Sequence, residues 1–385
     1  MEAGQLSLDA DVNTYLTSWK VPANEYIREQ PVTLRTILSH TAGFTVHGFP
    51  GYASGTKVPT LVQVLNGAPP ANTPAIRVDT KPGSEWRYSG GGYTVMQQMV
   101  LDVTHSAFPS YMTDAVLKPL GMLESSYQQP MPLKQEASAA TGYYPDGSPV
   151  KGKWHIYPEM AAAGLWTTPS DLAQFAIGVQ RSLSGASNMV VAMKTTELML
   201  TEVKSGDGLG LFLAGVGSAK RFSHDGRDEG FDASMVAYAS TGQGAVIMVN
   251  ANVNGPFIAR VMEIIAAQYK WPEYPMSIIY KPIPDREPKV TALIKSQLLQ
   301  MSEGKYDKPL YTDQLSKIIE AQIKGGLVGA FVSAGPLEAI ELVERKNVGD
   351  TRFYRFRLKF KNVTLLAPCV FDKDGKISSL ALMPE

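Results

Sequence analysis

Residues 88–103 read Tyr-Ser-Gly-Gly-Gly-Tyr-Thr-Val-Met-Gln-Gln-Met-Val-Leu-Asp-Val, and this stretch decides the fold. The apolar side chains that recur every three or four positions are Tyr93, Met96, Val100 and Val103. Their spacing predicts an amphipathic helix over about residues 92–105, with Tyr88 at its entry. The three glycines lack the spacing and the lysine of a phosphate-binding P-loop, so they do not indicate a nucleotide site.

A second helix has clear start signals. Thr168 suits the N-cap position, Pro169 suits the first turn, and Asp171 places an acidic side chain near the positive end of the helix. The residues that then supply an apolar face are Leu172, Phe175 and Val179. This pattern predicts a helix that starts just after Thr168.

The segment before Tyr88 is more irregular. Thr33 is a suitable N-cap for a short run with apolar residues at helical spacing, so a helix is predicted there that ends at Gly43. Residues 45–84 are rich in Gly, Pro, Ser and Thr, which predicts mostly loop. Surface loops of this length often line functional sites.

Beyond residue 208 the apolar pattern becomes that of strands. The apolar runs are residues 209–213, 233–238 and 245–250. Turn signals around Gly226 and at Thr241-Gly242 separate them, which predicts an antiparallel sheet. An apolar-rich helix predicted over Phe257–Tyr269 would cover one face of that sheet and give an α/β sandwich.

A proline-rich stretch divides the chain. Five prolines between residues 272 and 288 predict a semi-rigid connector over residues 271–286. The first domain is therefore expected over residues 1–270 and the second over residues 287–385. A chain of 385 residues is also long enough that two domains are expected from size alone.

The second domain is predicted to be a small α+β unit. Two helical stretches near residues 288–324 precede several strands. In one strand Phe356, Leu358 and Phe360 alternate with basic residues, so one face is buried and the other is solvated. The domain is similar in outline to cystatin-like or nuclear-transport-factor-like cones, and it contains no catalytic constellation.

Composition excludes several classes of function. Lys plus Arg and Asp plus Glu both number 36, which gives no indication of nucleic acid or an anionic membrane as partner. The lone Cys369 excludes an internal disulfide, and no group of His and Cys has zinc-site spacing. No apolar stretch reaches the length needed to cross a bilayer, and residues 1–20 lack a signal-peptide pattern, so a soluble chain is predicted.

Four short motifs follow one another in an order typical of one enzyme family. They are Leu38-Ser39-His40-Thr41-Ala42-Gly43, Tyr88-Ser89-Gly90, Ala163-Gly164-Leu165-Trp166-Thr167-Thr168 and His224-Asp225-Gly226. On these motifs the chain resembles the serine β-lactamase and penicillin-binding-protein-like hydrolases. More narrowly it resembles the class C-type branch, which includes esterases and D-amino peptidases. The resemblance covers residues 1 to about 270 and implies an antiparallel sheet with helices on both faces plus a helical subdomain.

The resemblance implies acyl-enzyme chemistry. In the family a serine and a lysine three positions later share one helix face, so that the amine can activate the hydroxyl. The second motif supplies a tyrosine that relays the proton, here Tyr88, although an aromatic residue packed under a loop is the alternative. The third motif begins at His224. After Gly226, the backbone N–H of Arg227 is the implied second oxyanion donor.

The nucleophile is expected upstream of Met1, because in the family it precedes the segment that matches Glu2–Leu8. That segment resembles the end of a helix with a glycine stop, so the domain is expected to be truncated and this chain to be inactive. The Ser-x-x-Lys sequences within the chain are Ser54 with Lys57, Ser148 with Lys151, and Ser302 with Lys305. They lie in a glycine-rich loop, a turn and the second domain, whereas the chemistry needs a rigid apolar helix. Ser54 with Lys57 is the in-chain candidate.

Several other residues of the resemblance have two interpretations. His224 stands where β-lactamases usually have lysine, which favours an esterase or a peptidase and gives a pH-dependent anchor for a carboxylate; a strand-end cap is the alternative. Gly90 replaces the asparagine of many relatives, and His40 is expected to be a buried structural histidine. The residues that either line the substrate cleft or pack as ordinary side chains are Trp154, His155, Tyr157 and Glu159.

The sequence as a whole therefore predicts a serine hydrolase of the β-lactamase-related superfamily that cleaves an ester, an amide or a D-amino acid peptide through an acyl-enzyme. The alternative is a non-catalytic relative that binds a ligand or a protein. No metal or organic cofactor is implied. The expected partner is a small-molecule or peptide substrate, and a homo-oligomer formed through the C-terminal domain is the further expectation. Substrate and compartment stay open, although members of this family are often exported.

Overall fold

The chain divides into two compact units, Met1–Pro275 and Met276–Glu385, each with its own hydrophobic core. The computed structural model describes residues 1–187, 190–252, 255–276 and 280–384. In the first unit the ring of Trp271 packs edge-on against Tyr238, with ring centroids 5.5 Å apart. In the second unit the guanidinium of Arg355 lies 4.3 Å from the ring centroid of Tyr280.

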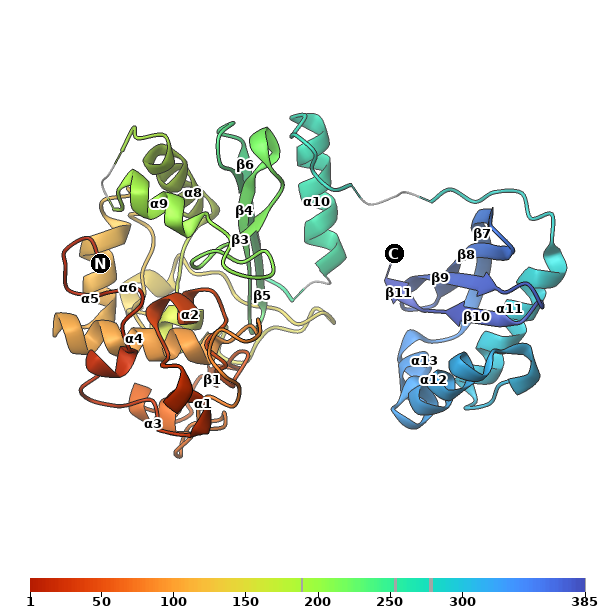
Figure 1. The fold of residues 1–385 in the computed structure, drawn as a ribbon, viewed down its shortest axis with the longest axis horizontal. Helices are drawn as coiled ribbons and strands as arrows, with labels where there is room; N and C mark the ends of the chain where they lie inside the picture. The colour runs from red at the N-terminus through yellow and green to blue at the C-terminus, as the bar shows by residue number, and fades with distance from the viewer. Residues whose placement is uncertain (188–189, 253–254, 277–279, 385) are drawn as a thin grey trace. The chain divides into compact units, whose positions relative to one another are not determined.

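The first unit combines helices with two antiparallel sheets (Figure 1). Its helices are α1 (Glu25–Glu29), α2 (Leu34–Leu38), α3 (Leu61–Asn66), α4 (Gly90–Thr104), α5 (Phe108–Met112), α6 (Leu133–Glu136), α7 (Met160–Ala163), α8 (Pro169–Leu183), α9 (Met193–Met199) and α10 (Gly255–Gln268). Its strands are β1 (Tyr52–Ala53), β2 (His155–Ile156), β3 (Phe212–Ala214), β4 (Arg221–Asp228), β5 (Phe231–Tyr238) and β6 (Gly244–Val249). Short helical turns are η1 (Val12–Thr14), η2 (Thr113–Leu117) and η3 (Gly217–Ala219).

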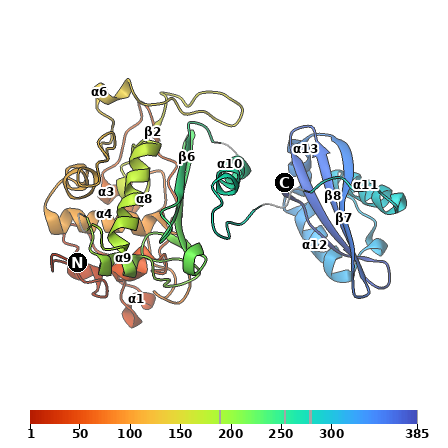
Figure 2. The ribbon, with the colours of Figure 1, turned by 90° about the horizontal axis from the view of Figure 1, so that it is seen from above.

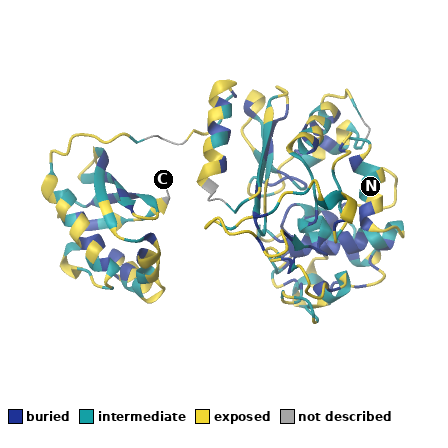
Figure 3. Ribbon diagram, turned by 180° about the vertical axis from the view of Figure 1, so that it is seen from behind, coloured by how far each residue is buried: buried dark blue, intermediate teal, exposed yellow. Residues whose placement is uncertain are grey.

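The larger sheet has the strand order β3-β4-β5-β6 and is covered by helices on both faces, which Figure 2 shows from above. On one face Phe222 and Met235 pack with Val179 of α8. On the other face Val236 packs with Met262 of α10, a helix along which buried and exposed positions alternate (Figure 3). The predicted antiparallel sheet and its helical cover are confirmed.

Strand β4 corrects two sequence interpretations. The sequence predicts a turn around Gly226, but Gly226 lies inside β4 and pairs with Ala233 of β5. The chain reverses instead after Asp228, through Glu229 and Gly230, and Gly230 has a φ of +83° that glycine adopts without strain. His224 likewise lies within the strand and does not cap its end. The prediction is wrong because β4 contains polar, turn-forming residues and becomes extended only through pairing with β5.

The glycine run at the start of α4 has a packing reason. Helix α4 begins at Gly90 with Ser89 as its N-cap, two residues earlier than the predicted start at 92. A β-carbon at Gly91 would lie 2.6 Å from the carbonyl oxygen of Thr45, closer than real β-carbons come. The glycines therefore allow the first turn of α4 to lie directly against the loop that contains Thr45.

The other local predictions have mixed outcomes. Helix α8 begins at Pro169 with Thr168 as N-cap, as predicted, and α2 begins after Thr33 but ends at Leu38, before Gly43. Helix α3, with its capping box, lies in the segment predicted as loop. Residues 2–8 form turns and bends and not the end of a helix.

The second unit places helices before an antiparallel sheet, as the sequence predicts. Its helices are α11 (Pro288–Ser302), α12 (Asp313–Lys324) and α13 (Leu327–Ala334), with the short turn η4 (Lys308–Leu310). Its strands are β7 (Leu337–Val348), β8 (Thr351–Phe360), β9 (Thr364–Phe371), β10 (Ile377–Leu380) and β11 (Met383–Pro384). The order is β10-β9-β8-β7, with β11 beside β9. Phe356, Leu358 and Phe360 are buried, so the predicted alternation along β8 is confirmed.

Candidate active site

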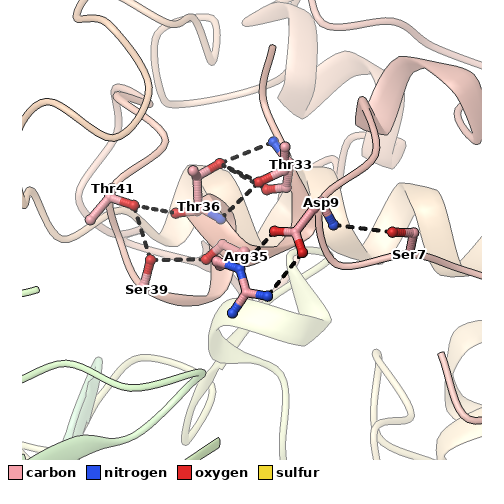
Figure 4. Close-up of polar contacts among 7 residues, drawn as sticks. All are labelled: Ser7, Asp9, Thr33, Arg35, Thr36, Ser39 and Thr41. Carbon is pink, nitrogen blue, oxygen red and sulfur yellow. Dashed lines mark hydrogen bonds and ion pairs between the residues drawn. The ribbon is translucent and has the colours of Figure 1, made fainter. Parts of the chain in front are cut away.

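The site is built on the loop that follows α2. Thr33 and Thr36 form a capping box at the start of this helix, and Arg35 holds Asp9 with two hydrogen bonds of 2.7 and 2.9 Å (Figure 4). The hydroxyl of Ser39 donates to the carbonyl oxygen of Arg35 and lies 2.9 Å from the hydroxyl of Thr41. These contacts fix the backbone on both sides of His40.

His40 in turn fixes the segment that contains Tyr88. The carbonyl oxygen of His40 accepts a hydrogen bond of 2.8 Å from the backbone N–H of Arg87, and its Nδ1 accepts one of 3.1 Å from the N–H of Ser89. Because Nδ1 is an acceptor, the imidazole is neutral, and burial lowers its pKa to about 4. His40 is 4% exposed, which confirms the expected buried histidine.

Tyr88 lies among aromatic and imidazole rings from distant parts of the chain. Its ring centroid is 4.1 Å from that of His40, 4.9 Å from His47, and 6.3 Å from His224. Burial and then the charge of Asp207 raise the pKa of the Tyr88 phenol. Among the described residues the hydroxyl of Tyr88 has no hydrogen-bond partner. The structure thus brings Tyr88 and His224 together, as the motif order implies.

Sequence analysis missed Phe212 and Asp207, which complete this ring cluster. Phe212 of β3 stacks on His224 at 5.4 Å and lies 6.3 Å from Tyr88. Asp207 is 1% exposed and accepts a hydrogen bond of 2.9 Å from the indole N–H of Trp86; burial raises its pKa to about 6. Neither residue belongs to a motif, and only the fold places them beside Tyr88.

Strand β4 presents its backbone next to this cluster. The carbonyl oxygen of Lys220 accepts a hydrogen bond from the N–H of Ala239. This bond shows which residue pairs of the β4–β5 ladder are hydrogen-bonded to each other and which pairs, alternating with these, are not. With this alternation, the N–H of Arg227 points away from β5. It points to the β3 side of β4. The pairing of β3 with β4 extends only to Ser223, which lies opposite Phe212, so β3 does not pair with Arg227. An N–H in this position has the direction that an oxyanion donor from the third motif requires.

The side chain of Arg227 is held away from that N–H. It forms two hydrogen bonds of 2.6 and 2.7 Å with the carboxylate of Asp232, which lies directly opposite on β5. At Gly226 a β-carbon would have only Ala233 within 4 Å, so the fold itself would tolerate alanine there. At Gly90 a β-carbon would lie 3.2 Å from the carbonyl oxygen of His47, a tight contact that a small backbone shift would have to relieve.

Burial raises the pKa of two carboxyl groups that no motif identifies as acids. Glu159, which precedes α7, is 0% exposed, and its pKa rises to about 7. Asp228, the last residue of β4, also has a pKa raised to about 7, by burial and then by Glu159. In β4, Asp228 shares a strand face with His224 and Gly226 because side chains alternate between faces.

Trp154 and His155 lie apart from the Tyr88 cluster. Trp154 is 9% exposed and packs edge-on against Trp166 at 5.3 Å, so the packing interpretation fits it. His155 belongs to β2, and its Nδ1 lies 2.8 Å from the carbonyl oxygen of Pro50. His155 lines a cavity of about 530 Å³ that also includes Glu229.

None of the three Ser-x-x-Lys sequences begins in the first turn of a helix. Ser54 is in the turn after β1, and Ser148 is in a turn where its hydroxyl donates to Asp146. Ser302 is the last residue of α11 in the second unit.

No group of three or more His, Cys, Asp and Glu side chains is arranged to hold a metal ion within the described ranges. Of the helices in the part of the chain that the structure describes, none has the length and apolar character to cross a membrane.

Comparison with known proteins places the first unit in a family. The Beta-lactamase family model matches residues 1–269. The putative penicillin-binding protein PbpX of Bacillus subtilis (strain 168) is 25% identical over 271 residues, which is 68% of this chain and 59% of that protein. Protein flp of Staphylococcus aureus (strain N315) is 30% identical over 173 residues, 44% of this chain and 31% of that protein. The chain therefore spans less than two thirds of the length of these relatives.

A solved structure resembles both units. The octameric penicillin-binding protein homologue from Pyrococcus abyssi has a TM-score of 0.57 and 18% identity, and the likeness covers 100% of this chain and 82% of that one. At this identity the likeness concerns the fold alone.

Proposed function

Because this chain belongs to the Beta-lactamase family, we propose that it carries the tyrosine and oxyanion part of a serine hydrolase site that cleaves an ester, an amide or a D-amino acid peptide. A serine Oγ attacks the carbonyl carbon, and its proton passes through Tyr88 to the leaving group. The carbonyl oxygen becomes an oxyanion that accepts a hydrogen bond from the N–H of Arg227. Water then attacks the acyl-enzyme and releases the acid.

The observation that carries this proposal is the meeting of Tyr88 with His224, whose ring centroids are 6.3 Å apart. The phenol has a raised pKa, so it holds its proton near pH 7 and becomes a base only beside a cation. His40 and His224 do not supply that cation, since burial lowers the pKa of both imidazoles. Tyr88 therefore needs a lysine beside it, which a Ser-x-x-Lys helix would provide.

None of the three Ser-x-x-Lys sequences within the chain fits the serine and lysine that this proposal requires. Ser54, Ser148 and Ser302 lie in turns or at a helix end, so we assign none of these three serines as the nucleophile. A protein that binds a ligand without turnover is the second candidate. The same placement of these three serines favours it.

Labelling with a fluorophosphonate probe separates the two candidates. The probe is applied to the protein isolated from its source and to residues 1–385 expressed alone, and the labelled peptide is identified by mass spectrometry. Labelling of a serine in the isolated protein supports the hydrolase if it is lost in Tyr88→Phe and kept in Tyr269→Phe, whose exposed side chain directly follows α10. An unlabelled protein that still binds ligands supports the second candidate.

We further propose that the second unit mediates self-association. Apolar side chains exposed on it include Val332 at 74%, Val348 at 56% and Leu299 at 46%. The homologue from Pyrococcus abyssi is octameric, and the likeness to it extends over this unit. Sedimentation of the whole chain and of its Val332→Asp variant tests this, since a smaller species is expected for the variant.

A further inference from the structure

A cavity of about 530 Å³ opens on the first unit at the opposite end of β4 from the ring cluster. Its wall includes Tyr52 of β1, Asn72, His155 of β2, and Glu229, which directly follows β4. The strand rises about 3.3 Å per residue, so Asp228 lies about 13 Å from His224 along β4. This volume is within the range of small-molecule sites.

Three carboxyl groups gather around one phenol next to this cavity. The N–H of Glu229 donates a hydrogen bond of 2.8 Å to the hydroxyl oxygen of Tyr157. The pKa of that phenol is raised by burial and by the charges of Asp228, Glu229 and Glu159, so all three groups are close to it. The Tyr157 ring stands directly behind the cavity wall, since a β-carbon on Gly51 would lie 2.5 Å from its Cζ.

Glu159 is the most unusual of the three. It is 0% exposed, and neither carboxyl oxygen has a hydrogen-bond partner among the described residues. Its charge also acts on Tyr52, a residue of the cavity wall. A buried carboxylate without a partner is costly, so this side chain requires either a proton or a nearby positive charge.

The cavity wall itself contains two basic side chains and one acidic side chain, Glu229, while Asp228 and Glu159 lie outside the wall. The basic side chains that line it are Lys57 and His155. Lys57 forms no ion pair within the described part of the chain, and His155 is directed by its contact with the carbonyl oxygen of Pro50. Glu229, Asp228 and Glu159 thus give this end of β4 an excess of acidic groups.

We propose that this cavity is a subsite for a primary ammonium group, the amino end of a short peptide or of an amino acid amide or ester. Glu229 in the wall and the half-buried Asp228 beside it accept the hydrogen bonds of the ammonium. Glu159 lies behind Tyr52 and Tyr157 and adds negative charge without touching the ligand. The subsite adds a substrate class to the proposed function. Only the statement that the bound molecule is the substrate rests on that function.

A binding titration tests the subsite without any need for turnover. The probes are glycylglycinamide and its N-acetyl derivative, which differ in one ammonium group, and amide chemical shifts of the whole chain are followed by NMR at pH 7. The free amine is expected to bind at least about tenfold more tightly and to shift Tyr52 and Asn72. Equal binding of the two probes, or no shift of these amides by the free amine at 20 mM (roughly the limit of weak specific binding), overturns the proposal.

Matched variants locate the effect. Glu229→Gln and Asp228→Asn are each expected to lose the preference for the free amine, whereas Glu197→Gln, on the exposed surface of α9, keeps it. Thermal melting of each variant verifies folding. A preference that survives in both folded acidic variants contradicts the subsite. The serine-labelling experiment is independent of this titration. If a serine is labelled but the free amine is not preferred, the subsite is contradicted and the proposed hydrolase function is not.

Discussion

The two halves of β4 have opposite chemical characters although they belong to one strand. In the first half, called the aromatic end below, His224 lies with Tyr88 and Phe212, and burial lowers the pKa of the His224 imidazole. At the other end, called the acidic end below, Asp228 lies near Glu159. The pKa of each carboxyl group is about 7, so both groups change charge near that pH. The aromatic end suits proton transfer, because burial raises the pKa of the Tyr88 phenol and a cation placed beside it would lower that pKa. The acidic end suits recognition of charge.

The largest expected effect is at the aromatic end. Changing Tyr88 to Phe removes the proton relay and should lower kcat/KM of the isolated protein by about 10²- to 10⁴-fold, with little change in melting temperature. Ester hydrolysis followed by absorbance measures it, with Tyr269→Phe as the matched control. An unchanged rate would show that the ring cluster is structural and not catalytic.

The second effect is at the acidic end and concerns stability. The pKa of Glu159 is about 7 in the fold and 4.5 without its environment, so the folded state holds this proton more tightly. The wild type should therefore lose stability as pH rises from 4.5 through 7, by at most about 3 kcal/mol from this group. Glu159→Gln removes that loss, so its melting temperature should rise relative to wild type at pH 8 but not at pH 4.5. Parallel pH profiles of the two proteins would contradict the assignment.

A third change is at Gly226, between His224 and Asp228 in β4. Gly226→Ala should leave the melting temperature within about 2 °C, because only Ala233 lies within 4 Å of the added methyl group. The methyl group would crowd an acyl group against β4, so a loss of roughly tenfold in kcat/KM is expected. By contrast, Gly91→Ala should destabilise the fold by about 1–3 kcal/mol through its clash with Thr45. Equal melting losses in the two variants would refute this distinction.

The smallest expected effect concerns ligand binding at the acidic end. Replacement of Lys57 by Met removes a cation from the cavity wall and should tighten binding of glycylglycinamide by about two- to fivefold, as expected for an exposed charge. The same NMR titration measures it. Weaker binding would mean that Lys57 contacts the ligand itself.

Local signals explain what the sequence could predict. Thr168 and Pro169 start α8, and the apolar spacing after Tyr93 specifies α4, because caps and helical periodicity are properties of neighbouring residues. The meeting of Tyr88 with His224 followed from motif order. Strand β4 was not predictable in the same way, since its polar residues become a strand only when β5 pairs with them.

The acidic end was beyond sequence reasoning for a different reason. The sequence predicts for Glu159 either a place in the cleft wall or ordinary packing, and none of the four motifs includes Asp228. Their proximity arises because α7, which Glu159 directly precedes, contacts β4, and these two elements are far apart in the chain. The burial that raises both pKa values is likewise a property of the assembled unit. A polar residue in a sequence carries no sign of how much water the fold leaves around it.

The two hydrogen bonds of His40 tie the first motif to the second, at Arg87 and Ser89. In hydrogen exchange these two amides should therefore not open separately. Both are released only when the loop after α2 detaches, so they should exchange with deuterium at one common, slow rate, as members of a single cooperative unit. Residues 39–43 and 87–89 would then behave as one element of native-state dynamics, although more than forty positions of sequence lie between them.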